Sequence, residues 1–253
     1  MARSELSDWW DELSATFHDG RYRCALVLDV DETLLNPLER WRDAVARDFH
    51  LELTVDEIEA AGGLDPMLRY RSDYVDFVAL ANRLRGDLAF NSDLPAVEGA
   101  LDGVRALERL SKVKVAFYLT TRPDVVRLET SENLRAVGFP DRPVITRPVH
   151  VSRDQTAEWK ADVLVEFVTM VRPTLVIVVD DNPNLAAHIP AMKINLLRPL
   201  LLLGPLSNAV VDREAFEELH GVPTASWPDV PRIVETMLDE EFDRMFGEDD
   251  RRD

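Results

Sequence analysis

The sequence predicts an α/β protein, a Rossmann-like three-layer sandwich with a mostly parallel sheet plus a small α-helical cap. Short apolar runs alternate with longer amphipathic segments, which is typical of parallel strands covered by helices on both faces. Polar clusters follow three of these runs, at the edge where an open α/β sheet binds its ligand. One long stretch with helical spacing and no strand predicts the cap.

Composition limits the function classes. The chain has 253 residues, 46% of them hydrophobic, which suffices for one large core or a core with a smaller unit attached. Its net charge of −18 disfavours long nucleic acids and anionic membranes as partners. The beginning of the chain lacks the apolar region of a signal peptide, and no run approaches the length of a membrane span. We therefore expect a soluble cytoplasmic protein; the sequence leaves its oligomeric state open.

The first two elements are a helix and a buried strand. Residues 1–20 form an amphipathic pattern that predicts a short helix. The run Cys24–Leu28 is wholly apolar and predicts a strand. Cys24 is the only cysteine, which excludes an intrachain disulfide and a Cys-rich zinc site. We expect it to be a small buried core residue.

The helical stretch follows directly. From about residue 37 to 84, apolar residues recur at spacings of three and four, and the stripe from Tyr70 to Leu84 is expected to face a small core. We therefore divide the chain into a catalytic core, residues 1–35 and 88–253, and a helical cap, residues 36–87. Its basic residues are expected to form ion pairs on a solvated face, although an anionic substrate could use one or two of them: Arg69, Arg71, Arg83 and Arg85.

The α/β alternation then resumes. Apolar runs flanked by turn residues predict strands, and amphipathic segments predict helices. The expected elements are helix 101–110, strand 113–119, helix 129–137, strand 144–145, helix 156–171, strand 175–179, strand 192–196 and helix 230–246.

Three strand ends carry the polar groups. Asp29 and Asp31 follow the first strand, Thr120 and Thr121 follow another, and the pair Asp180 and Asp181 follows a third. Because the carboxyl ends of parallel strands meet at one edge, these side chains should converge. Carboxylate oxygens without accompanying His or Cys suit Mg²⁺ and disfavour zinc.

Lys160 is the expected counter-charge. On a helical wheel it falls within the apolar arc of the helix 156–171. A cation there is costly unless it meets an anion, and the clustered carboxylates are the evident partner. The alternative is a lysine that extends from the core edge into solvent.

This set of residues resembles the four motifs of the haloacid dehalogenase-like superfamily of phosphatases and phosphotransferases. The matching positions occur in the family's order, with the helical cap between the first two: Asp29-Val30-Asp31-Glu32-Thr33, Thr120, Lys160, and Asp180-Asp181. The resemblance implies that Asp29 is the nucleophile that forms an aspartyl-phosphate, and that Asp31 is the general acid and base.

The resemblance also implies the remaining roles. Thr120 would bind the transferring phosphoryl group, and Lys160 would neutralise its charge and orient Asp29. Asp29, Asp181 and the backbone carbonyl of Asp31 would hold Mg²⁺, while Asp180 would brace Lys160 or a metal-bound water; the last two aspartates could exchange roles.

Two residues beside the second motif are candidate substrate ligands. Thr121 and Arg122 stand at the end of the same strand as Thr120. Arg122 could contact the substrate phosphate, or it could pair with Asp124 or another neighbouring acid.

The resulting hypothesis is a magnesium-dependent phosphatase that hydrolyses a phosphate monoester of a small metabolite. Alternatives are a nucleotidase or nucleic-acid-end phosphatase, a phosphomutase, and a non-catalytic binding module. An acid at position 31 disfavours dehalogenation within the resembling family. The sequence does not identify the substrate.

Overall fold

The structure is a computed structural model that describes residues 3–18, 22–61, 63–182, 184–189, 197–202, 222–224 and 226–246. Within them, six parallel strands form one sheet in the order β3-β2-β1-β4-β5-β6. This confirms the predicted Rossmann-like α/β class. The strands are β1 (Cys24–Leu28), β2 (Val113–Pro123), β3 (Val144–Arg147), β4 (Leu175–Asp180), β5 (Leu197–Leu202) and β6 (Val222–Thr224).

The strand β1 lies at the centre of the sheet and is buried on both faces. All five of its residues are buried, and it pairs with β2 on one side and β4 on the other. Successive side chains point to opposite faces. Cys24, Leu26 and Leu28 therefore pack into one core, and Ala25 and Val27 pack into the other.

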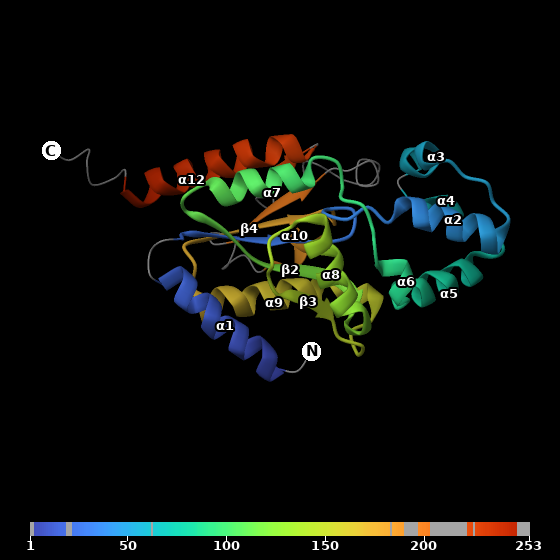
Figure 1. Ribbon diagram of the computed structural model, residues 1–253, viewed down its shortest axis with the longest axis horizontal. Helices are drawn as coiled ribbons and strands as arrows, with labels where there is room; N and C mark the ends of the chain where they lie inside the picture. The colour runs from blue at the N-terminus through green and yellow to red at the C-terminus, as the bar shows by residue number, and fades with distance from the viewer. Residues whose placement is uncertain are drawn as a thin grey trace.

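Helices cover both faces of the sheet (Figure 1). On one face lie α7 (Ala100–Arg109), α12 (Val230–Phe246) and the 3₁₀ turn η4 (Trp227–Asp229). On the other face lie α1 (Arg3–His18) and α9 (Thr156–Val171), which pack against each other. The core also contains, within the part of the chain that the structure describes, η1 (Asp124–Val126), α8 (Arg127–Val137), η2 (Arg153–Gln155) and α10 (Asn184–His188).

Five of the six helices that the structure describes between β1 and β2 form a separate body at the side of the sheet (Figure 1); the sixth is α7, which covers the sheet. The five are α2 (Leu38–Phe49), α3 (Val55–Ala60), α4 (Leu64–Leu68), α5 (Tyr74–Arg85) and α6 (Leu88–Asn91). They enclose small apolar clusters of their own, around Val45 and Phe77 and around Leu80 and Leu84. We call residues 38–91 the helical segment; its treatment as a cap remains a proposal.

Both ends of the helical segment lie side by side. The backbone N–H of Asn36 donates to the carbonyl of Pro95 at 2.8 Å, and Leu35 forms an antiparallel bridge with Ala96. The N–H of Val97 donates to the carbonyl of Leu34 at 2.8 Å. The chain therefore leaves the sheet and returns to it through neighbouring, hydrogen-bonded segments.

Most predicted elements match the structure within a few residues. β2 extends four residues beyond the predicted end at Leu119, so that Thr120 to Pro123 belong to the strand. Tyr70 was expected in the core of the helical segment but is 91% exposed, because it lies in the turn before α5 rather than on its apolar face. The predicted strand 192–196 lies outside the described residues.

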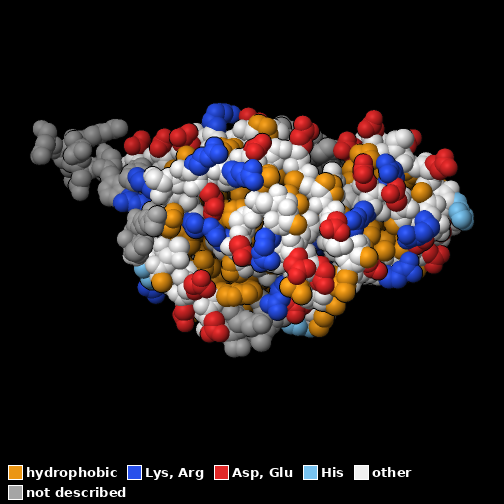
Figure 2. Space-filling view, viewed as in Figure 1, with side chains coloured by type: hydrophobic (Ala, Val, Ile, Leu, Met, Phe, Trp, Pro, Cys, Tyr) orange, Lys and Arg blue, Asp and Glu red, His pale blue; other side chains and the backbone are white. Residues whose placement is uncertain are grey.

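No helix among the described residues has the length and hydropathy needed to cross a membrane. On the face shown in Figure 2, acidic and basic side chains are mixed over both the sheet region and the helical segment. The excess of acids in the sequence is therefore not gathered into one patch on that face.

Candidate active site

The end of β1 places Asp29 at the centre of the sheet edge. The backbone N–H of Asp29 donates to the carbonyl of Val179 at 2.9 Å, which fixes this residue beside the last residue of β4, Asp180. Asp29 is 5% exposed and Asp180 is equally buried. The carboxylates of Asp29 and Asp180, at the ends of adjacent strands, are therefore buried next to each other.

Lys160 lies between these two carboxylates. Its Nζ donates to Asp29 Oδ1 at 2.6 Å and to Asp180 Oδ2 at 2.7 Å, and the side chain is 2% exposed. Burial alone would lower the pKa of Lys160, but the negative charges of Asp180 and Asp29 outweigh it and keep the pKa above its ordinary value. Lys160 is therefore a buried cation held by an ion-pair network, as its place on the apolar arc of α9 predicted.

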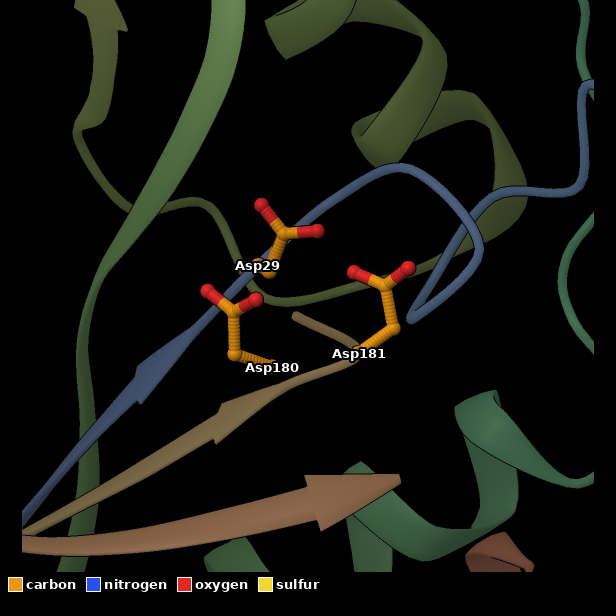
Figure 3. A group of neighbouring side chains, drawn as sticks. All are labelled: Asp29, Asp180 and Asp181. Carbon is orange, nitrogen blue, oxygen red and sulfur yellow. The ribbon is translucent and has the colours of Figure 1, made fainter. Parts of the chain in front are cut away.

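Asp181 completes a group of three carboxylates (Figure 3). The fold brings three carboxylate oxygens, one from each of Asp29, Asp180 and Asp181, within 4.8 Å of one another. Burial and then the charges of Asp180 and Asp31 raise the pKa of Asp29 to about 7, against the charge of Lys160. Burial and the charges of Glu32, Asp29 and Asp180 also raise the pKa of Asp181.

This donor set fits a hard divalent cation. The crowding that raises these pKa values means that one ammonium does not balance the negative charge, and a dication would lower the cost of keeping the carboxylates ionised. Because all the donors are carboxylate oxygens, the chemistry suits Mg²⁺ rather than zinc.

The two aspartates at the end of β4 have different surroundings. Asp180 Oδ2 accepts from Lys160, and Asp180 Oδ1 accepts from the backbone N–H of Asn182 at 2.9 Å. Both oxygens of Asp180 are thus engaged by the protein, which suits a residue that braces Lys160. Asp181 lines a cavity at the sheet edge and is the better placed of the two for contact with a ligand.

Asp31 is held by Arg122. The Nε of Arg122 donates to both carboxylate oxygens of Asp31, at 3.1 and 3.0 Å, and its Nη2 donates to Oδ1 at 2.6 Å. The Nη1 of Arg122 donates to Thr130 Oγ1 and to the carbonyl of Asn91. Arg122 is 2% exposed, whereas Asp31 is 33% exposed.

These contacts show the second possibility for Arg122, the pairing with a neighbouring acid. All three guanidinium nitrogens donate to protein acceptors, but Arg122 also lines the cavity, so its contact with a substrate stays a prediction. Arg122 fixes the position of Asp31 at the wall of the cavity, and it connects this carboxylate to β2 and α8.

The two threonines of β2 also differ in position. Thr120 is fully buried, and its Oγ1 accepts from the backbone N–H of Arg122 at 3.2 Å. Thr121 contributes to the wall of the cavity, whereas Thr120 does not. Contact of Thr120 with a phosphoryl group stays a prediction, and Thr121 is the threonine of β2 that reaches the cavity wall.

The cavity has a volume of about 690 Å³ and lies between the sheet edge and the helical segment. Its walls include Asp29, Asp31, Lys160 and Asp181. They also include Arg85, one of the four arginines named from the sequence as possible contacts of an anionic substrate, and three residues for which the sequence predicted no such position: Glu32, Arg147 and Arg153. No local pattern singles these residues out, because they meet only through the fold.

Glu32 is unusual in both backbone and charge. Its φ of 61° lies in the left-handed region, which is rare for a residue with a side chain. Burial, followed by the charges of Asp31 and Asp29, raises its pKa to about 8, while Arg85 acts in the opposite direction. The turn after Asp29 thus places a further carboxyl group at the cavity.

A distant tryptophan anchors this turn. The Nε1 of Trp227 donates to the carbonyl of Thr33 at 2.6 Å, and the ring is 2% exposed within the core beneath α7 and α12. The position of the residues that follow β1 therefore depends on packing from the C-terminal part of the chain.

Comparison with known proteins supports this fold. The sequence matches no protein-family model and no curated protein. It is similar in structure to a protein from Burkholderia xenovorans LB400 described as a haloacid dehalogenase-like hydrolase, with a TM-score of 0.51 and 16% identity, over 86% of this chain and 99% of that one. It is also similar to a protein from Clostridium difficile described as a phosphatase, with a TM-score of 0.53 and 13% identity, over 84% and 98% of the two chains. Likeness at this level of identity shows a shared fold.

Proposed function

We propose that this chain, which has the fold of haloacid dehalogenase-like hydrolases, is a magnesium-dependent phosphatase. Its substrate is a phosphate monoester of a small metabolite, and the reaction passes through an aspartyl-phosphate on Asp29. The observation that carries the proposal is the buried Lys160 ammonium between Asp29 and Asp180, in a group of three carboxylates that opens to a cavity.

The charges of the site fit phosphoryl transfer. A carboxylate can attack a phosphate ester only where its own charge and that of the phosphoryl oxygens are balanced. Lys160 supplies one fixed cation in contact with Asp29. Asp29 and Asp181, with the backbone carbonyl of Asp31, would hold Mg²⁺, and the bound ion would neutralise much of the remaining negative charge.

The first half of the reaction forms the covalent intermediate. A carboxylate oxygen of Asp29 attacks phosphorus as the bond from phosphorus to the ester oxygen breaks. Asp31, held at the cavity wall by Arg122, donates its proton to the departing oxygen, which leaves as an alcohol. Lys160 remains protonated throughout and keeps Asp29 in position.

The second half regenerates the enzyme. Asp31, now a carboxylate, accepts a proton from a water molecule as the water oxygen attacks phosphorus. The bond from phosphorus to Asp29 breaks, which releases inorganic phosphate and restores the free carboxylate of Asp29. Asp31 is protonated again and ready for the next ester.

The test is hydrolysis of para-nitrophenyl phosphate by the native protein and by Asp29→Asn, with and without Mg²⁺. We expect turnover that requires Mg²⁺ and falls by at least about a thousandfold in the variant, because the nucleophile is lost. Asp141→Asn is the matched control, since Asp141 is exposed and its carboxylate pairs with Arg135 on the surface.

Two results would contradict the proposal. Full activity of Asp29→Asn would remove Asp29 as the nucleophile. No turnover by the native protein, together with no binding of Mg²⁺ or of inorganic phosphate, would point to a non-catalytic module.

A further inference from the structure

One arginine of the helical segment differs from the others. Of the four arginines named above as possible contacts of an anionic substrate, three form ion pairs on the surface: Arg69 with Asp65, Arg71 with Asp73, and Arg83 with Asp48. Arg85, the last residue of α5, lines the cavity instead. It therefore lies among the residues that a bound molecule would meet.

The guanidinium of Arg85 is fixed but incompletely satisfied. Its Nη1 is buried and has no hydrogen-bond partner among the described residues. Its central carbon lies 5.3 Å from the centre of the Trp41 ring, in the geometry of a cation–π interaction. A buried donor without a partner is uncommon and costly, which indicates that another group satisfies it.

Two more arginines, both outside the helical segment, line the same cavity. Arg147, at the end of β3, donates through Nε to the carbonyl of Thr121 at 3.1 Å and through Nη1 to the carbonyl of Val151. Arg153 begins η2, and its guanidinium makes no hydrogen bond or ion pair with any part of the chain that the structure describes. The core and the helical segment thus contribute cations to one space.

These like charges affect one another. Burial, and then the positive charge of Arg153, lower the pKa of Arg85 to about 10, with a further contribution from Arg147. Asp31 and Glu32 act in the opposite direction. At neutral pH Arg85 is still charged, so the three arginines repel one another across the cavity, and a bound anion would relieve that repulsion.

Neighbouring acids offset this positive charge only in part. Asp31 and Glu32 act on Arg85 through their charge, but among the described residues neither forms a hydrogen bond or ion pair with it. Of the two other carboxylates that line this part of the cavity, Asp65 already accepts hydrogen bonds from Arg69 and from the Tyr74 hydroxyl, at 3.1 and 2.6 Å. Asp154 is exposed to solvent. Asp31 is held by Arg122.

The cavity also has room for more than a phosphoryl group. Its volume of about 690 Å³ lies in the range of sites that hold an organic molecule. The proposed reacting groups come from the ends of β1 and β4 and from α9, whereas the three arginines come from α5, from the end of β3 and from η2. One molecule could therefore engage both groups of residues.

We propose that Arg85, Arg147 and Arg153 form a subsite for a second anionic group, so that the enzyme selects phosphate esters whose leaving group carries a carboxylate or a further phosphate. This inference rests on the proposed phosphatase function. The subsite explains why Arg85 turns into the cavity while its neighbours in the helical segment form surface pairs.

The experiment compares matched substrates. One series consists of alkyl phosphates of increasing chain length with a terminal carboxylate, each beside its terminal amide, which has nearly the same size without the charge. A second series carries a terminal phosphate and distinguishes the two kinds of anion. We expect the native enzyme to prefer at least one anionic ester over its uncharged counterpart by about tenfold or more in kcat/KM, as charge-assisted hydrogen bonds allow.

Arg85→Ala should lose that preference. The ratio of kcat/KM between the anionic and uncharged esters should fall about tenfold or more, because the alanine cannot bind the second charge. Use of the ratio cancels any effect of the substitution on the chemical step itself. Arg83→Ala is the matched control two residues away, since Arg83 is exposed and pairs with Asp48 outside the cavity; its ratio should equal that of the native enzyme.

Calorimetric binding of the same esters to Asp29→Asn separates this inference from the proposed function. If neither series is hydrolysed but anionic esters still bind more tightly than the amides through Arg85, the catalytic proposal fails and the subsite stands. If the native enzyme shows no preference at any chain length, or if Arg85→Ala retains it, the subsite is refuted while the phosphatase activity is not.

Discussion

At the residue scale, the buried ammonium of Lys160 determines whether Asp29 and Asp180 can be ionised in the folded protein. Both carboxylates lie within 2.7 Å of Nζ, and all three side chains are nearly inaccessible to solvent. A buried ion pair contributes little net stability, but removal of one partner leaves uncompensated charge. Loss of Lys160 should therefore lower the stability of the folded protein as well as its catalytic activity.

Lys160→Met should lower the free energy of unfolding by about 3–5 kcal/mol near neutral pH, measured by urea denaturation. The loss should be smaller at pH 5, because the folded variant can then keep Asp29, whose pKa is already raised, in its neutral form. Lys114→Met is the control: Lys114 is only 28% exposed but lies 3.9 Å from Glu108 in a loose pair, and its loss should cost under about 1 kcal/mol. An equal loss for the two variants would contradict the importance of the network.

Arg122 is predicted to act through Asp31. Without the guanidinium, Asp31, the proposed general acid, loses the contacts that hold it. Arg122→Met should therefore slow the hydrolysis of esters with poor leaving groups more than that of esters with good ones. We expect kcat for phenyl phosphate to fall about tenfold or more beyond the fall for para-nitrophenyl phosphate. Arg122→Lys, which retains a charge, should recover part of the difference.

A structural role alone would give another pattern. If Arg122 only supports the fold, both substrates should slow equally and the loss should follow the fraction of folded protein seen by circular dichroism. That outcome would remove Arg122 from the mechanism.

At the element scale, the contact of α7 with η4 controls the turn that follows β1. Gly103 lies on the buried face of α7, and an added Cβ there would meet the Cε3 of Trp227 at 2.6 Å. The same indole donates to the carbonyl of Thr33, four residues after Asp29. The spacing between two helical elements on one face of the sheet is therefore transmitted to the candidate active site.

Gly103→Ala should lower stability by about 1–3 kcal/mol, since the new methyl group forces Trp227 to shift. It should also reduce phosphatase activity measured under conditions where the protein is folded. Gly86→Ala is the matched control, because its added Cβ meets nothing closer than 3.7 Å. Unchanged activity of folded Gly103→Ala would show that the turn does not depend on Trp227.

Elements and single site residues differ in how far the sequence predicts them. The strands and the longer helices follow from local patterns. The first five residues of β4 form an unbroken apolar run, and α9 covers the same residues as the helical pattern of apolar positions. Asp29 and Asp180 were predicted to meet because parallel strands align their carboxyl ends, and Lys160 was predicted to join them because it falls on the apolar arc of its helix.

Other contacts needed the fold. Arg122 and Asp31 are 91 positions apart, and nothing local to Arg122 distinguishes Asp31 from Asp124 as its partner. The burial of Thr120 and the inward position of Arg85 likewise depend on how β2 and α5 are rotated about their own axes, which periodicity leaves uncertain by a residue or more.

At the scale of the whole molecule, the acidic site should link stability to pH and to Mg²⁺. The folded state raises the pKa of Asp29 from 3.8 to about 7 and that of Glu32 from 4.5 to about 8. At pH values between the unfolded-state and folded-state pKa values of these two groups, the folded protein binds more protons than the unfolded chain. The free energy of unfolding therefore falls as pH rises through this range. Above about pH 8 this contribution is lost.

The metal-free protein should therefore have a lower Tm at pH 8 than at pH 5, and Mg²⁺ should raise Tm more at pH 8. At a hundredfold excess over Kd the ion should contribute roughly 3 kcal/mol. Asp181→Asn should weaken this stabilisation, measured as the rise in Tm with increasing Mg²⁺ concentration in differential scanning calorimetry. A Tm that Mg²⁺ does not change at either pH would argue against a metal site in this group of carboxylates.

The helical segment also has a genetic consequence. Because the chain leaves near Asn36 and returns near Pro95, at positions joined by a hydrogen bond, the ends of the segment already meet. A deletion or exchange of residues 38–91 can be closed by a short turn without any change in the strand order of the sheet. Recombination could thus replace the wall that holds Arg85 while the aspartates and Lys160 are inherited intact, so that leaving-group preference and the reacting groups can evolve separately.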